Sequence, residues 1–81
     1  MVILGVDAHK NTHTFVAIDD AGRKLGERTV AATTDGHLQV LQWAVRWTER
    51  RFAIEDRRDV SRRLEADLLA AGEAVHACLL S

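Results

Sequence analysis

Two acidic residues, Asp7 and Glu55, occupy positions where carboxylates could do chemistry. Asp7 closes the apolar run 2–6, and Glu55 follows the short apolar segment 52–54. An ionised carboxylate at the end of a buried strand is costly without a partner, and a divalent cation would be such a partner. The carboxyl ends of parallel strands share one edge of a sheet, where functional groups gather. We therefore predict that Asp7 and Glu55 together ligate one Mg²⁺ or Mn²⁺ ion.

Each acid taken alone also has a structural interpretation. Asp7 could cap the turn that follows it, and Glu55 could stand at a helix N-terminus, where acids interact well with the helix dipole. For Asp7 the two interpretations are balanced, and for Glu55 the structural one is stronger. Only their joint position at strand ends favours a metal site.

Other reactive residue types in the chain give weaker patterns. His9 and His13 are four residues apart, which suits zinc on a helix, but this segment is predicted to be a turn that enters a strand. The single cysteine, Cys78, lies in an apolar stretch and is expected to be a packed thiol. The glycines form no phosphate-binding fingerprint, and no Ser–His–Asp arrangement stands out.

The elements that must position the two acids follow from periodicity and turn residues. Segment 19–23 has turn chemistry, Thr33 and Thr34 suit an N-cap, and Gly72 suits the residue just after a helix. The order β-β-β-α-β-α-β predicts an α/β fold with a mixed sheet whose later strands run parallel to the first. Strands are predicted at 2–7, 12–19, 24–31, 51–55 and 74–80, and helices at 36–50 and from Asp56 or Asp59 to 71.

The first predicted helix presents a broad apolar surface for packing. Leu38, Leu41 and Val45 share one face, and the neighbouring stripe is formed by Val40, Ala44 and Trp47. Trp43 and Trp47 lie one turn apart, and core packing is favoured over base stacking for both. In the second helix the packing positions are Val60, Leu64, Leu68 and Ala71.

Composition and charge set limits on the class of protein. The 81 residues make one small domain or part of a larger one, and 47% apolar residues are ample for a core. The formal net charge of −1 excludes a generally basic protein, yet seven of the eleven basic residues are arginines between positions 46 and 63. This run permits a phosphate-facing patch, although a solvated pair of helix surfaces is the simpler interpretation. No secretory signal or transmembrane stretch is recognised, so we predict a cytoplasmic protein without a membrane partner.

Three segments resemble one family of proteins. Residues 2–22 (VILGVDAHKNTHTFVAIDDAG) resemble the opening of transposases of the insertion sequence 110 family. Segment 52–56 (FAIED) and segment 64–72 (LEADLLAAG), with the strand after it, also resemble that family's first domain. The resemblance covers residues 2–75, and the first segment is its most specific part.

The resemblance implies a RuvC-like, RNase H-type fold with an Asp-Glu-Asp-Asp tetrad that binds Mg²⁺. By motif, Asp7 matches the first Asp and Glu55 the Glu, while the last two acids of the family normally lie beyond residue 81, in an Asp-x-x-Asp motif on a helix. Family members also carry a C-terminal domain with a nucleophilic serine, and they act on DNA with a guide RNA encoded by the element. In the intact parent, Lys10, Arg57 and Arg58 would contact the nucleic-acid backbone.

We therefore interpret residues 1–81 as a partial RuvC-like domain from a truncated gene copy. The parent would cleave and exchange DNA strands, and the isolated chain is expected to be inactive. A first alternative is a non-catalytic remnant that binds DNA, a second copy or an intact transposase. A second is a nucleotide-binding fragment of the actin-like ATPase type, which is disfavoured because segment 8–12 has no glycine.

Overall fold

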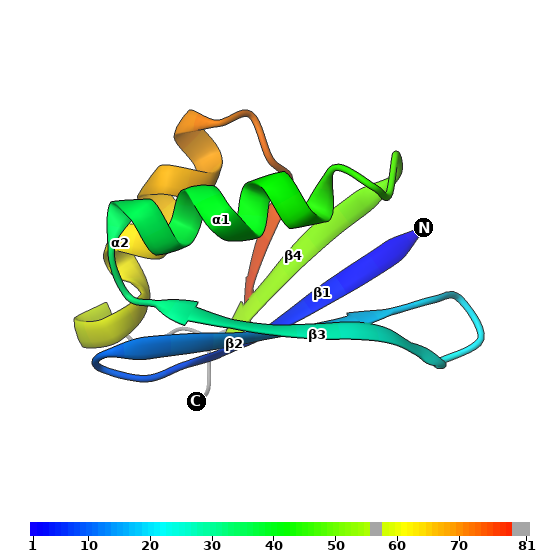
Figure 1. The fold of residues 1–81 in the computed structure, drawn as a ribbon, viewed down its shortest axis with the longest axis horizontal. Helices are drawn as coiled ribbons and strands as arrows, with labels where there is room; N and C mark the ends of the chain where they lie inside the picture. Colours follow the sequence, from blue (N-terminus) through cyan, green and yellow to red (C-terminus); the bar gives the residue numbers. More distant parts are fainter. Residues whose placement is uncertain (56–57, 79–81) are drawn as a thin grey trace.

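The fold is a five-stranded mixed sheet with two helices, in a computed structural model that describes residues 1–55 and 58–78. Both helices cover the same face of the twisted sheet (Figure 1). The sheet order is β3-β2-β1-β4-β5, and the observed element order is the predicted one. The elements are β1 (Val2–Ala8), β2 (Thr12–Ile18), β3 (Lys24–Ala31), α1 (Thr34–Ala44), β4 (Arg50–Glu55), α2 (Arg58–Ala70) and β5 (Val75–Cys78).

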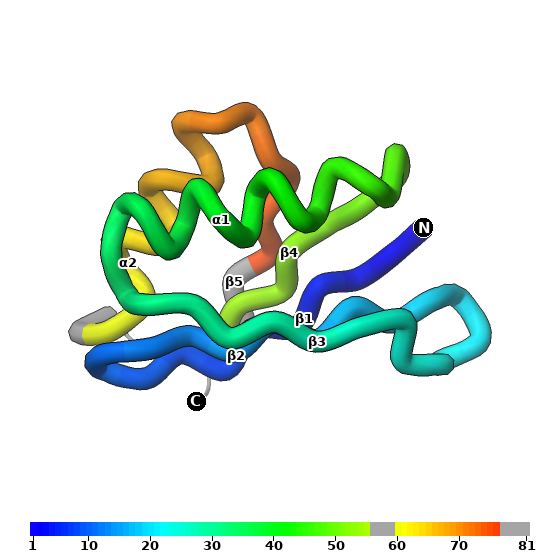
Figure 2. Tube along the Cα trace, viewed as in Figure 1, coloured from blue at the N-terminus to red at the C-terminus, as the bar shows by residue number. Residues whose placement is uncertain are grey.

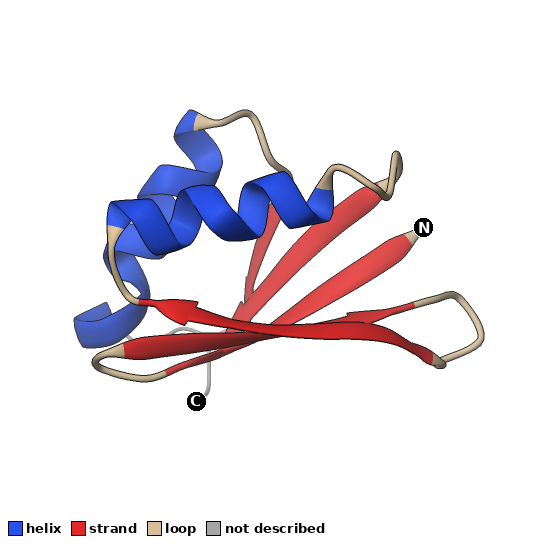
Figure 3. Ribbon diagram, viewed as in Figure 1, coloured by secondary structure: helices blue, strands red, loops and turns tan. Residues whose placement is uncertain are grey.

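Strand directions agree with the prediction of a mixed sheet. β1, β2 and β3 form an antiparallel meander, whereas β4 pairs parallel to β1 and β5 parallel to β4. Each parallel step is made by one helix, α1 before β4 and α2 before β5, as Figure 3 shows in its helix and strand colours. Such crossovers bring the carboxyl ends of β1 and β4 to the same edge of the sheet.

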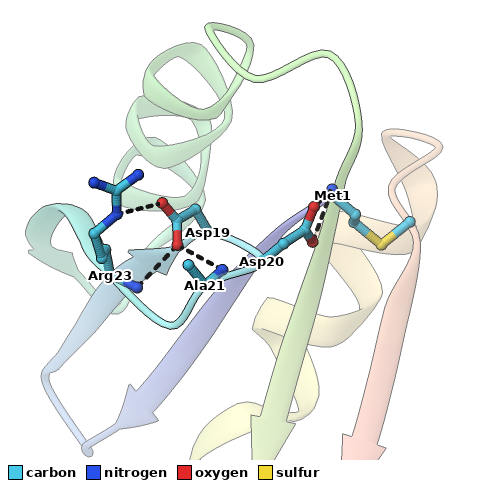
Figure 4. A network of polar contacts seen from close by, with 5 residues as sticks. All are labelled: Met1, Asp19, Asp20, Ala21 and Arg23. Atoms are coloured by element: carbon cyan, nitrogen blue, oxygen red, sulfur yellow. Dashed lines mark hydrogen bonds and ion pairs between the residues drawn. The ribbon is translucent and has the colours of Figure 1, made fainter.

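The turn between β2 and β3 is built by acidic side chains, as its sequence predicted (Figure 4). One carboxylate oxygen of Asp19 accepts hydrogen bonds from the backbone N–H groups of Ala21 and Arg23, both at 2.9 Å. Gly22 adopts a φ of 83°, which glycine allows at little cost. The N-terminal ammonium of Met1 binds both carboxylate oxygens of Asp20, at 3.0 and 3.1 Å, and so ties the start of β1 to this turn.

The core lies between the helices and one face of the sheet. Leu4, Phe15 and Phe52 are fully buried there, and the two phenylalanine rings meet edge to face with centroids 6.1 Å apart. α2 contributes Leu64 and Leu68, both predicted packing positions and both fully buried. Both faces of β2 are partly covered, as the sequence suggested: Phe15 and Ala17 are buried under the helices, and Thr14, Val16 and Ile18 on the other face are half-buried. No helix of the described part of the chain covers that other face, which is open (Figure 1).

The first helix is shorter than predicted, and only part of its predicted apolar surface packs. It ends at Ala44 rather than near residue 50, because the chain must turn back for Arg50 to pair with Val2 on β1. Val40 and Ala44 are fully buried as predicted, and Leu41 and Trp47 pack partly against the core. Leu38 and Val45, which were also predicted to pack, are 52% and 64% exposed. Trp43 is buried as predicted, and the other buried residues of α1 are Gly36, His37, Val40 and Ala44.

The predicted N-cap of the first helix and the predicted glycine after the second helix are confirmed in detail. The Thr33 hydroxyl accepts the N–H of Gly36 at 3.1 Å, which caps α1. At the end of α2, Gly72 has a φ of 82°, its N–H donates to the Leu69 carbonyl, and the Glu73 N–H donates to the Leu68 carbonyl. This pattern is the Schellman motif that a glycine just after a helix favours. Asp56, the other predicted start of the second helix, and residues 79–80 of the fifth strand lie outside the described residues.

One largely buried ion pair fixes the start of β4 to the loop before β5. The Arg50 guanidinium binds Glu73 through two hydrogen bonds of 2.7 and 2.9 Å, and it donates a third to the Trp47 carbonyl at 2.8 Å. Glu73 is 9% exposed and Arg50 19%, so solvent screens this pair weakly. The two loops at this end of the sheet are thereby joined to each other.

We expect Glu73→Gln to lower the free energy of unfolding by about 1–3 kcal/mol, because it leaves a half-buried guanidinium without its anion. Urea denaturation followed by tryptophan fluorescence measures this change. Glu49→Gln is the matched control, since Glu49 is exposed and its loss should change stability by less than about 0.5 kcal/mol. Equal midpoints for the two variants would contradict a stabilising role for the pair.

Candidate metal centre on the open face of the sheet

Asp7 lies at the carboxyl end of β1 with its side chain on the open face. Successive residues of a strand point to opposite faces, so Leu4, Val6 and Ala8 enter the core while Asp7 does not. Its side chain is 67% exposed. The sequence predicted a carboxylate at a buried position, but here water solvates it. The carboxylate therefore needs no cation for stability and is open to bind one.

Glu55 reaches the same place from the neighbouring strand. The parallel register pairs Gly5 with Ala53 and Val6 with Ile54, so Asp7 and Glu55 are the next residues along their strands. Both acids line one hollow of about 450 Å³, whose floor is apolar. The other residues that line it are Gly5, Val6, Thr14, Val16 and Ala53. The structure thus brings together the two acids that the sequence singled out.

Polar side chains extend from Asp7 across the antiparallel strands. Asp7 pairs with Thr14 on β2, and the Thr14 hydroxyl is 3.0 Å from that of Thr29 on β3. On the other side, His9 Nε2 lies 3.1 Å from Asp7 Oδ2. The spacing of His9 and His13 raised only the question of zinc binding, and this contact was not predicted. The signal was present, because residues 7 and 9 are two apart and extended backbone places such residues on one side.

The second histidine of the His9–His13 pair lies elsewhere, which agrees with the low weight given to a zinc site. His13 is 1% exposed and stacks on His37 of α1, with ring centroids 5.5 Å apart. The His37 Nδ1 atom is in turn 2.6 Å from Asp67 Oδ2 on α2. Burial and the neighbouring His37 lower the pKa of His13 below its usual value. This buried cluster is separate from the hollow, and the sequence did not predict it.

The described residues give only part of a metal coordination sphere. Within residues 1–55 and 58–78, no three His, Cys, Asp or Glu side chains are arranged so that they could hold a metal ion. Two carboxylates with waters suffice for weak binding of a hard cation such as Mg²⁺ or Mn²⁺. The oxygen donors of Asp7 and Glu55 therefore fit such an ion as two of its ligands.

The predicted nucleic-acid contacts are only partly described. Lys10 is exposed in the turn between β1 and β2, at the same end of the sheet as Asp7. Arg57 lies outside the described residues, and Arg58 begins α2. No helix in the described part of the chain is long and apolar enough to cross a membrane.

Comparison with solved structures identifies the class of fold. The catalytic core domain of BIV integrase, known from a crystal structure, superposes with a TM-score of 0.57 at 17% sequence identity. The superposition covers 94% of this chain and 53% of that one, so the present chain spans about half its length. At this identity the likeness shows the fold alone, which is α/β and RNase H-like, as predicted.

Comparison with family models gives the family. The model of the DEDD transposases of insertion sequence 110, described as "Transposase", matches residues 4–78. The chain therefore belongs to this transposase family, which confirms the resemblance seen in the sequence. Among curated proteins, none matches the chain.

Proposed function

We propose that this chain is the metal-binding part of a DNA transposase, with Asp7 and Glu55 as ligands of Mg²⁺ or Mn²⁺. One observation carries the proposal: the two acids line one hollow at the carboxyl ends of adjacent parallel strands, on the open face of the sheet. Membership of a transposase family supports DNA as the substrate. A bound divalent cation would polarise the scissile phosphate and activate the attacking group.

The protein's own groups have distinct roles in this proposal. Asp7 and Glu55 hold the cation, while Lys10, Arg57 and Arg58 bind the phosphate backbone and give the affinity a salt dependence. Because only two such acids line the hollow among the described residues, water or groups outside the described residues must complete the coordination sphere. We accordingly propose that residues 1–81 form a partial RuvC-like domain that does not cleave DNA alone. A guide RNA, a homo-oligomer or an intact transposase would be its partners in the cytoplasm.

Titration with Mn²⁺, followed by the loss of its free-ion EPR signal, tests the metal site directly. We expect weak binding by the 81-residue chain, with a Kd of about 0.1–1 mM, and competition by Mg²⁺. Asp7→Asn keeps the size of the side chain but removes its charge, and it should weaken Mn²⁺ binding about tenfold or more.

Asp20→Asn is the control for this titration. Asp20 is another exposed aspartate, held by the N-terminal ammonium at the opposite end of β1. Its loss should leave Mn²⁺ affinity unchanged if binding is local to the hollow. Equal affinities for the wild type and Asp7→Asn would exclude Asp7 as a ligand.

A non-catalytic binding function is the second candidate, favoured by the uncovered apolar part of the open face. Ile3 is 37% exposed on that face, and Val16 and Ala53 line the hollow. An exposed apolar surface of this kind can bind another protein segment. The measurement of Mn²⁺ binding distinguishes the metal-binding function from the non-catalytic one, because association through the apolar surface needs no cation.

A further inference from the structure

His9 lies directly beyond the candidate metal ligand Asp7, in a fixed backbone position. Its backbone N–H donates to the Thr12 carbonyl at 2.9 Å, which closes the turn between β1 and β2. The preceding residue, Ala8, pairs with His13 in the sheet. The side chain of His9 is therefore presented to Asp7 by ordered backbone on both sides of the turn.

The hydrogen bond between His9 and Asp7 has a defined donor and a defined acceptor. An ionised carboxylate only accepts hydrogen bonds, so the 3.1 Å contact requires that His9 Nε2 carries the proton and donates it to Asp7 Oδ2. This bond occupies one lone pair of Oδ2 and restricts rotation of the carboxylate. The other oxygen and the remaining lone pairs stay available for a cation. Partners of this kind orient metal-ligating carboxylates in many metal sites.

We propose that His9 is a positioning residue, which orients the Asp7 carboxylate for the divalent cation without binding that cation itself. The inference rests on the proposed function, because it presupposes a metal at Asp7. It adds a positioning residue to the predicted ligand set of Asp7 and Glu55.

The solvent exposure of His9 and Asp7 limits how much the hydrogen bond between them can change metal affinity. The side chains of His9 and Asp7 are 58% and 67% exposed, so water competes for the hydrogen bond. Loss of a buried partner of a metal ligand weakens metal binding about 10–100-fold. For this exposed pair we expect the lower end of that range or less, about three- to tenfold.

The test compares His9→Ala with His9→Gln by Mn²⁺ titration of the 81-residue chain. A glutamine amide can place an N–H donor near the position of Nε2, whereas alanine cannot. We expect a Kd about three- to tenfold higher for His9→Ala and a return to within about twofold of wild type for His9→Gln. His76→Ala is the control, since His76 is an exposed histidine on β5. Thermal unfolding of each variant checks that the fold is retained.

Each outcome has a distinct meaning. No Mn²⁺ binding by the wild type would overturn the proposed metal site, and this inference with it. Wild-type binding together with an unchanged His9→Ala Kd would overturn the inference alone. Equal weakening by alanine and glutamine would exclude positioning through a hydrogen bond. A pulsed-EPR signal from a directly ligated nitrogen, lost in His9→Ala, would show that His9 binds the ion itself, contrary to the proposal.

Discussion

Gly36→Ala is expected to prevent stable folding, with a loss of at least about 3 kcal/mol in the free energy of unfolding. A Cβ atom at Gly36 would lie 1.9 Å from the Ala31 carbonyl oxygen, 2.9 Å from its carbon and 3.0 Å from its nitrogen. All three atoms belong to the backbone at the end of β3, so no side-chain rotation relieves the overlap. The first turn of α1 and the end of β3 would have to separate.

The surrounding bonds make that separation costly. The Gly36 N–H is held by the Thr33 hydroxyl at 3.1 Å, and the Ala32 N–H donates to the Asn11 carbonyl at 2.8 Å. The β3–α1 junction is thus tied both to its own helix and to the turn between β1 and β2. A small domain has only about 5 kcal/mol to lose, so a change of this size removes most of the folded population.

Urea denaturation and the dispersion of amide signals in NMR spectra measure the effect. Gly5→Ala is the matched control, because a Cβ at Gly5 meets only the Val16 carbonyl at 4.0 Å, an ordinary contact. That variant should stay within about 1 kcal/mol of wild type. Similar midpoints for the two alanine variants would show that the junction is looser than the structure indicates.

The sequence predicted the element order and the mixed sheet completely, and the packing surface of α1 in part. Short apolar runs joined by helices indicate later strands parallel to the first, and the continuous trace of Figure 2 shows both helices on the same side of the sheet. On α1, Val40 and Ala44 are buried as predicted, whereas Leu38 and Val45 are exposed, and the buried His37 occupies a core position. A hydrophobicity pattern assigns histidine to the surface, so it could not show this.

The candidate site was predictable to the extent that it depends on strand topology. Asp7 and Glu55 meet because each ends a strand and the two strands are parallel neighbours, which periodicity alone suggests. The contacts of His9 and of His37 depend on side-chain rotamers and on how α2 lies against α1. Neither property produces a periodic pattern in a single sequence, so neither contact could be predicted without the structure.

The stability of the chain is expected to fall as the pH drops below about 6.5, because of the buried His13 between β2 and α1. His13 and its neighbour His37 are each 1% exposed, and each ring has one buried nitrogen that finds no hydrogen-bond partner among the described residues. Burial lowers the pKa of His13 from its usual 6.5, and the nearby His37 and His9 lower that pKa further, while a backbone interaction with Thr12 opposes the change. A proton on His13 is therefore disfavoured in the folded state.

The direction of the change in stability with pH follows from the numbers of protons that the folded and unfolded states bind. As the pH falls through 6.5, His13 in the unfolded chain binds a proton before His13 in the folded chain does. The unfolded state then holds more protons, so the free energy of unfolding decreases with decreasing pH, by at most about 1.4 kcal/mol per pH unit for this one group. The stability is complete above 6.5 and is lost between 6.5 and the lowered pKa of the folded state.

Urea denaturation of wild type, His13→Phe and His13→Gln between pH 5 and pH 8 isolates this contribution. Phenylalanine keeps a flat ring against His37, glutamine keeps polarity, and neither titrates in this range. The slope of the free energy of unfolding against pH should therefore become shallower in both variants.

His76→Ala is the control, because His76 is exposed and its removal should leave this slope as in wild type. Since His37 bonds to Asp67 on α2, protonation of His13 places a positive charge against a ring that already joins two helices. If both His13 variants keep the wild-type slope, the acid sensitivity must come from other groups, and Asp67→Asn would then show whether the His37 contact is its source.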